Sequence, residues 1–271
     1  MMIFLHVPKT GGTSFRFVLE NSFGVSHCHT NHTRKPVFRQ QDLNFASRIF
    51  PGLRSIAGHN IINPLSLSVR DPFYITVLRE PISRVISHYQ DGVLRGGKTE
   101  SFEQALRRNE EFENLYVKLM AGERNLDKAK HFLEKCNMVG LTEKFDLSLE
   151  ILGRLSPYKL NLNYKRKVVA RDYSLRRSIQ ANATLMEMAR EYNKLDLELH
   201  SFAVGQIFPK LCEKAGLRPS AQVASYDTYT TEMKPKYQIG RFYNKVFRQI
   251  CKVSLASLPY MAVCPDSQLG I

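Results

Sequence analysis

A short apolar run, a glycine pair and a helical pattern follow one another at the start of the chain. Residues 3–7 form a β-type run that ends at Pro8. A tight turn follows at Gly11-Gly12, and apolar residues recur at helical spacing from Ser14 onward. A strand, a tight turn and a helix in this order form the repeating unit of parallel α/β sheets, so this segment constrains the fold more than any other.

Two further segments have the same organisation. Residues 73–78 are β-rich, and Pro81 suits the first turn of a helix with apolar positions over 82–89. Residues 137–141 predict another strand, with Thr142 as the N-cap of the next helix. Strands that alternate with helices predict a single α/β domain with a P-loop-like parallel sheet, and the turns after the strands should meet at one edge.

The remaining segments give weaker signals. Residues 27–58 predict irregular structure apart from a helix at 42–49 and a strand at 55–57. Residues 101–135 and 183–206 have helical patterns. No internal repeat divides the chain, so we expect one domain over residues 1–271.

Two parts of this domain differ in character. We expect the nucleotide-binding core to cover about residues 1–206 and a basic C-terminal extension to cover about 207–271. Within the extension, 216–242 has no clear period, and the last thirty or so residues are basic and amphipathic.

The turn at residues 8–14, Pro-Lys-Thr-Gly-Gly-Thr-Ser, has the chemistry of an anion cradle. Backbone N–H groups and the helix dipole favour negative charge there, Lys9 adds a full positive charge, and Thr10, Thr13 and Ser14 add hydroxyl donors. The lysine precedes the glycines, whereas the nucleotide hydrolases have the pattern GxxxxGK[ST]. The turn therefore predicts a phosphate site of another class.

The phrase His-Val-Pro-Lys-Thr-Gly-Gly-Thr-Ser-Phe at 6–15 resembles the 5′-phosphosulfate loop of the sulfotransferase family that includes heparan sulfate 2-O- and uronyl sulfotransferases. The resemblance implies a sulfotransferase fold and 3′-phosphoadenylyl sulfate (PAPS) as the donor. It also implies that the 5′-phosphate contacts Lys9, Thr10, Gly11, Gly12, Thr13 and Ser14. Lys9 would in addition reach the bridging oxygen of the phosphosulfate and act in catalysis.

Two later segments extend the resemblance. Residues 78–89 look like the family's 3′-phosphate motif, in which Arg79 and Ser87 would bind the 3′-phosphate that ATP lacks. Arginine at a strand end suits bidentate phosphate binding. Residues 139–146 resemble the segment near the adenosine, where Thr142 would contact the nucleotide and Phe145 would lie beside it.

Sulfuryl transfer needs a base for the acceptor hydroxyl, and His59 is the first candidate. The sequence Ala-Gly-His-Asn around it resembles the Gly-His element of the 2-O-sulfotransferases, although Ala57 stands where some relatives have a companion histidine. Histidine titrates near neutral pH and accepts a proton readily. Another histidine, a carboxylate such as Glu80, or no base at all remain as alternatives, and Glu80 is expected to pair with a neighbouring arginine.

The net charge of +14 predicts an anionic partner. The resemblance implies a glycan or another hydroxylated acceptor, which the basic segments could steer, although exposed lysines are commonly just solvated. These segments are 165–167, 176–177 and 234–252. Two alternatives remain, a nucleotide-dependent kinase and a non-catalytic binder of anionic polymers, but no nucleic-acid motif is present, so no nucleic-acid partner is expected.

Two further expectations concern metals and cellular context. No carboxylate cluster or His/Cys set has ligand spacing, so we expect no metal and an EDTA-insensitive reaction. The five cysteines lack pair spacing and are expected to be free thiols. No signal peptide or membrane span is visible, which predicts a cytoplasmic protein.

Overall fold

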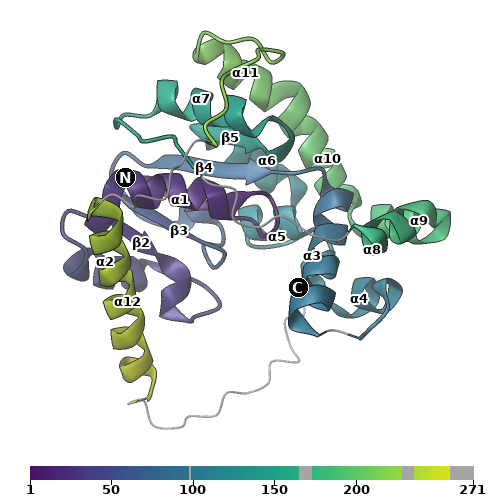
Figure 1. Ribbon diagram of the computed structural model, residues 1–271, viewed down its shortest axis with the longest axis horizontal. Helices are drawn as coiled ribbons and strands as arrows, with labels where there is room; N and C mark the ends of the chain where they lie inside the picture. The colour runs from purple at the N-terminus through teal and green to yellow at the C-terminus, as the bar shows by residue number, and fades with distance from the viewer. Residues whose placement is uncertain (98, 165–172, 228–234, 257–271) are drawn as a thin grey trace.

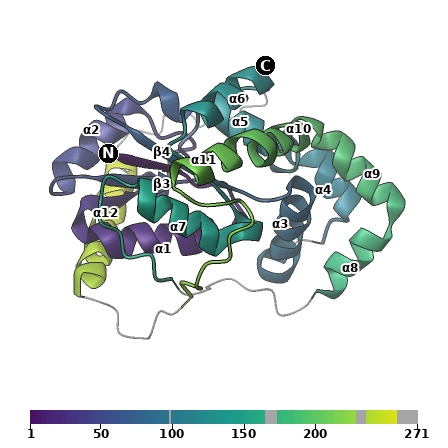
Figure 2. The same cartoon turned by 90° about the horizontal axis from the view of Figure 1, so that it is seen from above.

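A five-stranded parallel sheet forms the centre of the protein, in a computed structural model that describes residues 1–97, 99–164, 173–227 and 235–256. The sheet order is β2-β3-β1-β4-β5, and helices cover both faces (Figures 1 and 2). The strands are β1 (Met2–Leu5), β2 (His27–His29), β3 (Ser55–Gly58), β4 (Phe73–Leu78) and β5 (Met138–Leu141). The predicted α/β class with a parallel sheet flanked by helices is confirmed.

The strand predictions were right at four of five positions. β1, β3, β4 and β5 coincide with the predicted runs to within two residues at either end. The prediction for residues 27–58 was wrong at β2, a strand of only three residues whose sequence is His-Cys-His. Such a short polar strand carries no alternating pattern, and β2 forms through pairing with β3.

Twelve α-helices are described. They are α1 (Gly12–Phe23), α2 (Gln40–Ile49), α3 (Pro81–Gly96), α4 (Phe102–Arg108), α5 (Leu115–Ala121), α6 (Leu126–Lys135), α7 (Phe145–Leu155), α8 (Ser174–Ala181), α9 (Ala183–Tyr192), α10 (Lys194–Phe202), α11 (Phe208–Lys214) and α12 (Pro235–Ala256). The predicted helical stretch 101–135 is divided into three helices. The stretch 183–206 is divided at Asn193, whose buried amide donates to the carbonyls of Phe112 at 2.8 Å and Ala189 at 3.0 Å.

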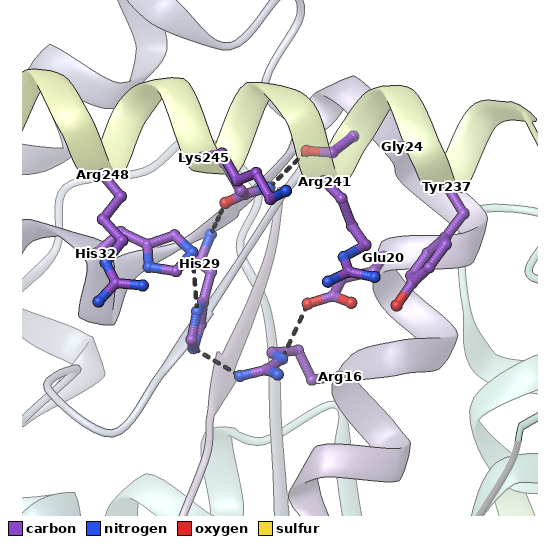
Figure 3. Close-up of a pocket in the computed structure, with 11 residues that line it drawn as sticks. Arg16, Glu20, Gly24, His29, His32, Tyr237, Arg241, Lys245 and Arg248 are labelled. Atoms are coloured by element: carbon purple, nitrogen blue, oxygen red, sulfur yellow. Dashed lines mark hydrogen bonds and ion pairs between the residues drawn. The ribbon is translucent and has the colours of Figure 1, made fainter. Parts of the chain in front are cut away.

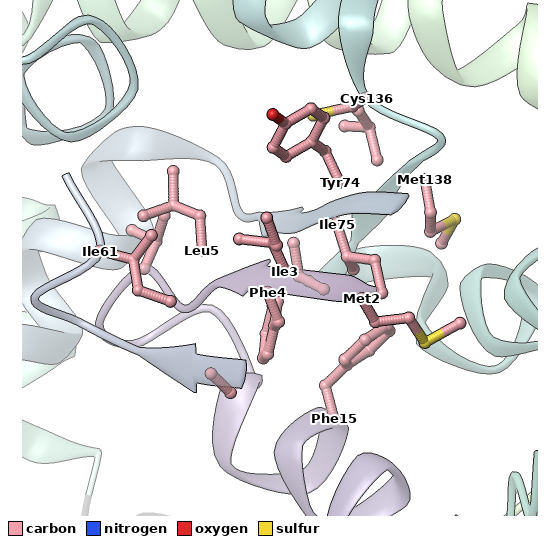
Figure 4. Close-up of a cluster of buried hydrophobic side chains, with 14 of the residues drawn as sticks. Met2, Ile3, Phe4, Leu5, Phe15, Ile61, Tyr74, Ile75, Cys136 and Met138 are labelled. Carbon is pink, nitrogen blue, oxygen red and sulfur yellow. The ribbon is translucent and has the colours of Figure 1, made fainter. Parts of the chain in front are cut away.

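The hydrophobic core lies around the central strand. All four residues of β1 are fully buried, and the Phe4 ring lies 4.8 Å from the ring of Phe15 on α1 (Figure 4). Full burial of a side chain of this size contributes about 1.5–3 kcal/mol. The packing of β1 against α1 therefore fixes where the connecting loop lies.

The sheet edge at β2 is completed by the last described helix, α12. The side chain of Asn244 accepts from the His29 N–H at 2.8 Å and donates to the His27 carbonyl at 2.9 Å. Gly240 packs so closely on Gly24 that an added Cβ would lie 2.6 Å from its backbone. The start of α12 at Pro235 was not predicted, because glycine and asparagine lie on the buried face of this helix and residues 216–242 therefore show no clear apolar period.

Candidate functional site

The loop between β1 and α1 presents an uncapped helix end. Lys9 and Gly11 both have left-handed backbone conformations, with φ of 68° and 78°. Gly11 is the N-cap of α1, yet no side chain in the described part of the chain caps this helix, and its first turn has no acidic residue. The N–H groups and the positive end of the helix dipole are therefore directed at the space where an anion would lie.

The two glycines of the loop are enclosed by aromatic rings. A Cβ on Gly12 would lie 1.9 Å from the ring of His6, so only glycine fits without displacing that ring. At Gly11 an added Cβ would lie 3.2 Å from the ring of Phe145, the residue expected near the nucleotide. The glycines thus allow two rings to pack directly on the loop.

Hydroxyl groups tie the loop to neighbouring strands. The buried Thr10 hydroxyl donates to the Val7 carbonyl at 2.9 Å, so this side chain supports the loop from within. The Thr142 hydroxyl lies 2.7 Å from the Thr10 carbonyl and 3.0 Å from the Leu78 carbonyl. The N-cap prediction for Thr142 was wrong, because α7 begins after Lys144 and the Thr142 hydroxyl joins the loop to β4 instead. Thr13 and Ser14 are half-buried on the first turn of α1.

Arg79, directly after β4, lies beside the loop. Its Nη1 donates to the Lys9 carbonyl at 3.3 Å, and its own carbonyl accepts from the Tyr116 hydroxyl at 2.7 Å. Among the described residues no carboxylate lies within ion-pair distance of its guanidinium. Burial, and then the nearby Arg176 guanidinium, lowers the pKa of Arg79. This cation is therefore available to an anionic ligand, with Arg176 as a second positive group close by.

Helix α3 brings Ser87 to the same region. Glu80 caps this helix by accepting from the N–H groups of Ile82 at 3.0 Å and Ser83 at 2.7 Å. Contrary to the expectation, it forms no ion pair with an arginine of the described residues. The confirmed first-turn Pro81 follows it. One turn after Ser87, Asp91 forms an ion pair with the Lys9 ammonium at 3.2 Å.

Residues four apart share a helix face, so the pairing of Asp91 shows that the Ser87 face is directed toward Lys9. Asp91 and Tyr116 are two residues of this region that were not predicted from the sequence. The four-residue spacing from Ser87 was a signal for Asp91. Tyr116 acts through a contact between helix α5 and the segment after β4, which no local sequence pattern indicates.

His59 lies at the carboxyl end of β3, beside the end of β1. Its Nδ1 and the His6 carbonyl form a short hydrogen bond, and its backbone N–H donates to Asn31 Oδ1 at 2.8 Å. Because a carbonyl oxygen only accepts, Nδ1 carries the proton and Nε2 keeps its lone pair. The rings of His59 and His6 lie 4.0 Å apart, so the histidine neighbour of His59 is the residue that directly follows β1 and not a residue at position 57.

Burial is the main cause that lowers the pKa of His59 below its usual 6.5, while its hydrogen bond to His6 partly opposes the shift. A neutral imidazole with one fixed tautomer is suited to accept a proton. The other histidines have different surroundings: His88 contacts Glu111 at 3.0 Å, and His29 contacts Arg16 at 2.7 Å.

Three remaining expectations concern the chain as a whole. Within the described residues, no group of three or more His, Cys, Asp or Glu side chains is placed to hold a metal ion. No helix in the same ranges is long and apolar enough to cross a membrane. The described cysteines are free and buried, at positions 28, 136, 212 and 251, while Cys264 and the basic segment 165–167 lie outside the described residues.

Comparison with known proteins identifies the family. The model of the sulfotransferase family matches residues 1–203. Heparan sulfate 2-O-sulfotransferase hst-2 of Caenorhabditis elegans is 28% identical over 100 residues, which cover 33% of this chain and 31% of that relative. A crystal structure of a sulfotransferase from Alicyclobacillus acidocaldarius has a TM-score of 0.42 and 15% identity, covering 73% of this chain and 95% of that one. The family match extends from the phosphate loop through Arg79, Thr142 and α10, and this chain belongs to the sulfotransferase family.

Proposed function

We propose that the protein transfers the sulfuryl group of PAPS to a hydroxyl group of an acidic carbohydrate. The observation that carries this proposal is the contact between Arg79 and the Lys9 carbonyl. In this contact a cation at the end of β4, with no carboxylate of the described residues within ion-pair distance, lies against the loop that starts α1. Two phosphate-binding groups on adjacent strands suit a nucleotide with both a 5′- and a 3′-phosphate.

In this proposal Lys9, the N–H groups from Thr10 to Thr13, and the hydroxyls of Thr13 and Ser14 hold the 5′-phosphosulfate. The Ser14 N–H already donates to the Gly11 carbonyl at 3.0 Å. Arg79 and Ser87 bind the 3′-phosphate, and Thr142 keeps the loop against β4 near the adenosine. Thr10 contributes through its backbone, because its hydroxyl already donates to Val7. The donor supplies an activated sulfuryl group, and the chain's residues bind and orient it.

His59 acts as the general base. Its Nε2 takes the proton of the acceptor hydroxyl as the new oxygen–sulfur bond forms and the bond between sulfur and the bridging phosphate oxygen breaks. The His6 carbonyl holds the opposite nitrogen and stabilises the imidazolium produced.

Lys9 stabilises the negative charge that develops on the departing phosphate. Asp91 forms an ion pair with the Lys9 ammonium at 3.2 Å. Because the Asp91 side chain is 37% exposed, solvent can replace this ion pair when the Lys9 ammonium turns to the donor. Asp91 is therefore proposed as a positioning residue for Lys9.

An acidic glycan is the acceptor that fits the chain's charge. The net charge of +14 favours anionic partners, and the relative hst-2 acts, by its name, on heparan sulfate. A radiolabelled transfer assay tests the proposal, with PAPS compared with ATP as donor and heparosan as acceptor, each with and without EDTA. We expect labelled sulfate on the glycan from PAPS, insensitive to EDTA. Phosphate transfer from ATP would support a kinase, and glycan binding without transfer from either donor would support a non-catalytic binder.

A further inference from the structure

A basic pocket of about 350 Å³ lies between α1, the β2 edge and α12 (Figure 3). Its wall on the α1 side contains Arg16 and Glu20, and its wall on the β2 side contains His29 and His32. The third wall is one face of α12, with Tyr237, Gly240, Arg241, Asn244, Lys245 and Arg248. None of these residues belongs to the proposed nucleotide site.

The lining has a strong excess of positive charge. Glu20 is the one carboxylate among the lining residues, and it already pairs with Arg16 at 2.9 Å. Three more cations, Arg241, Lys245 and Arg248, stand at helical spacing on α12 and are exposed. Because these three share one face of the helix, their charged groups can converge on a ligand in the pocket.

The histidines of the pocket are hydrogen-bonded and neutral. Arg16 can only donate, so its contact with His29 Nε2 at 2.7 Å leaves the His29 proton on Nδ1, which lies 3.4 Å from His32 Nε2. Burial, followed by Arg248 and Arg16, lowers the pKa of His32 to about 4. The nearby cations disfavour protonation of these imidazoles, and the same positive charge favours the binding of an anion in the pocket.

The pocket and the proposed base share a structural support. The short helix η2 (Thr30–Thr33) follows directly after His29 and includes His32, and its Asn31 accepts from the His59 backbone N–H at 2.8 Å. Arg16 also lies near enough to lower the pKa of His59. A ligand in the pocket is therefore held by the same segment that positions the base.

We propose that this pocket binds a carboxylate or sulfate group of the acidic glycan acceptor, and so determines which acceptors present a hydroxyl to His59. This inference rests on the proposed function, from which it takes the acceptor class. The α12 wall lies beyond residues 1–203, the part matched by the family model. The other two walls of the pocket lie within that matched part.

Direct binding tests the inference without any need for turnover. Isothermal titration with a size-defined N-sulfated oligosaccharide of uronic acid and glucosamine compares the wild type with Lys245→Ala/Arg248→Ala. We expect the double substitution to raise Kd about tenfold at low salt, and we expect the difference to shrink as salt is added. The matched control is Arg190→Ala/Lys210→Ala, which removes the same two charges from exposed positions on α9 and α11 and should leave Kd within about twofold of wild type.

Two further probes identify the bound group. If Lys245→Ala/Arg248→Ala still weakens the binding of a carboxyl-reduced oligosaccharide, the bound group is a sulfate. If it still weakens the binding of an N-acetylated, unsulfated oligosaccharide, the bound group is a carboxylate. Equal affinities of the pocket and control variants would overturn the inference. It would also be overturned if the pocket variant lost affinity for duplex DNA as much as for the oligosaccharide, because the pocket would then be an unselective polyanion patch.

The outcome is separable from the proposed function. Failure of the PAPS transfer assay with pocket-dependent oligosaccharide binding would refute the sulfotransfer reaction and keep the glycan subsite. Successful transfer, together with oligosaccharide binding that the pocket substitutions do not change, would support the sulfotransfer reaction and refute the glycan subsite.

Discussion

The centre of the sheet and its β2 edge are built in different ways. At the centre, β1 and β4 lead into loops that bring Lys9 and Arg79 together, and the contact between these two residues joins the segments that follow two adjacent strands. At the edge, three-residue β2 depends on Asn244, which comes from a helix more than two hundred residues later. The centre is thus built from strand–loop–helix units that repeat along the chain, whereas the edge depends on packing between segments far apart in the sequence.

This difference separates two tasks in our account. In the proposed mechanism the centre binds the donor, while the edge stabilises the η2 segment and binds the acceptor. Substitutions in the two regions should therefore fail in different assays.

The largest expected effect comes from removal of the base, where the two regions meet. His59→Ala should lower kcat about a hundredfold or more, because the acceptor hydroxyl loses its proton acceptor. Transfer of radiolabelled sulfate from PAPS to heparosan measures the loss. Kd for adenosine 3′,5′-bisphosphate, measured by titration, should stay within about twofold of wild type, since the hydrogen bonds of His59 are to the His6 carbonyl and to Asn31 of η2 and not to the N–H groups of the phosphate loop. Substantial retained turnover would remove His59 from this role.

A smaller effect is expected at the edge, and it concerns stability. Asn244→Leu leaves the His29 N–H and the His27 carbonyl without their partner, so the free energy of unfolding should fall by about 2–3 kcal/mol. Urea denaturation measures the change. Gln249→Leu, at an exposed position on the same helix, is the control and should change stability by less than about 0.5 kcal/mol. Equal unfolding midpoints for the two variants would show that α12 does not support the edge.

The smallest expected effect is on the pH profile. Burial lowers the pKa of His59, so the neutral base is favoured at pH 7 and is lost only as pH falls through a value below 6.5. The acid limb of kcat/KM should therefore lie below pH 6.5 and fall about tenfold per pH unit. Initial rates in buffers of constant ionic strength measure it. An acid limb above pH 7 would indicate that another group titrates.

The same contrast explains which features could be predicted from sequence. β1 and β4 are apolar runs bounded by Pro8 and Pro81, so their patterns are local and readable. β2 has no such pattern, and the start of α12 is hidden because its buried face includes Gly240 and Asn244. Their roles depend on the partners that folding brings together.

The site shows the same limit at the level of single residues. The motif placed Arg79 and Ser87 near the loop, and the positions of both are consistent with that expectation. Thr142 was expected to cap a helix, but its hydroxyl is directed at the carbonyls of Thr10 and Leu78. Residue type and spacing indicate which group is near the site, whereas its hydrogen-bond partner depends on the geometry of two strands.

The central claim is that Lys9 and Arg79 form two phosphate sites for one nucleotide. Its most direct measurement is the Kd of adenosine 3′,5′-bisphosphate and of adenosine 5′-monophosphate for the wild type and for Arg79→Ala. We expect the wild type to prefer the bisphosphate by about a hundredfold and the variant to lose most of that preference, with Kd for the monophosphate nearly unchanged. An undiminished preference in Arg79→Ala would contradict the claim.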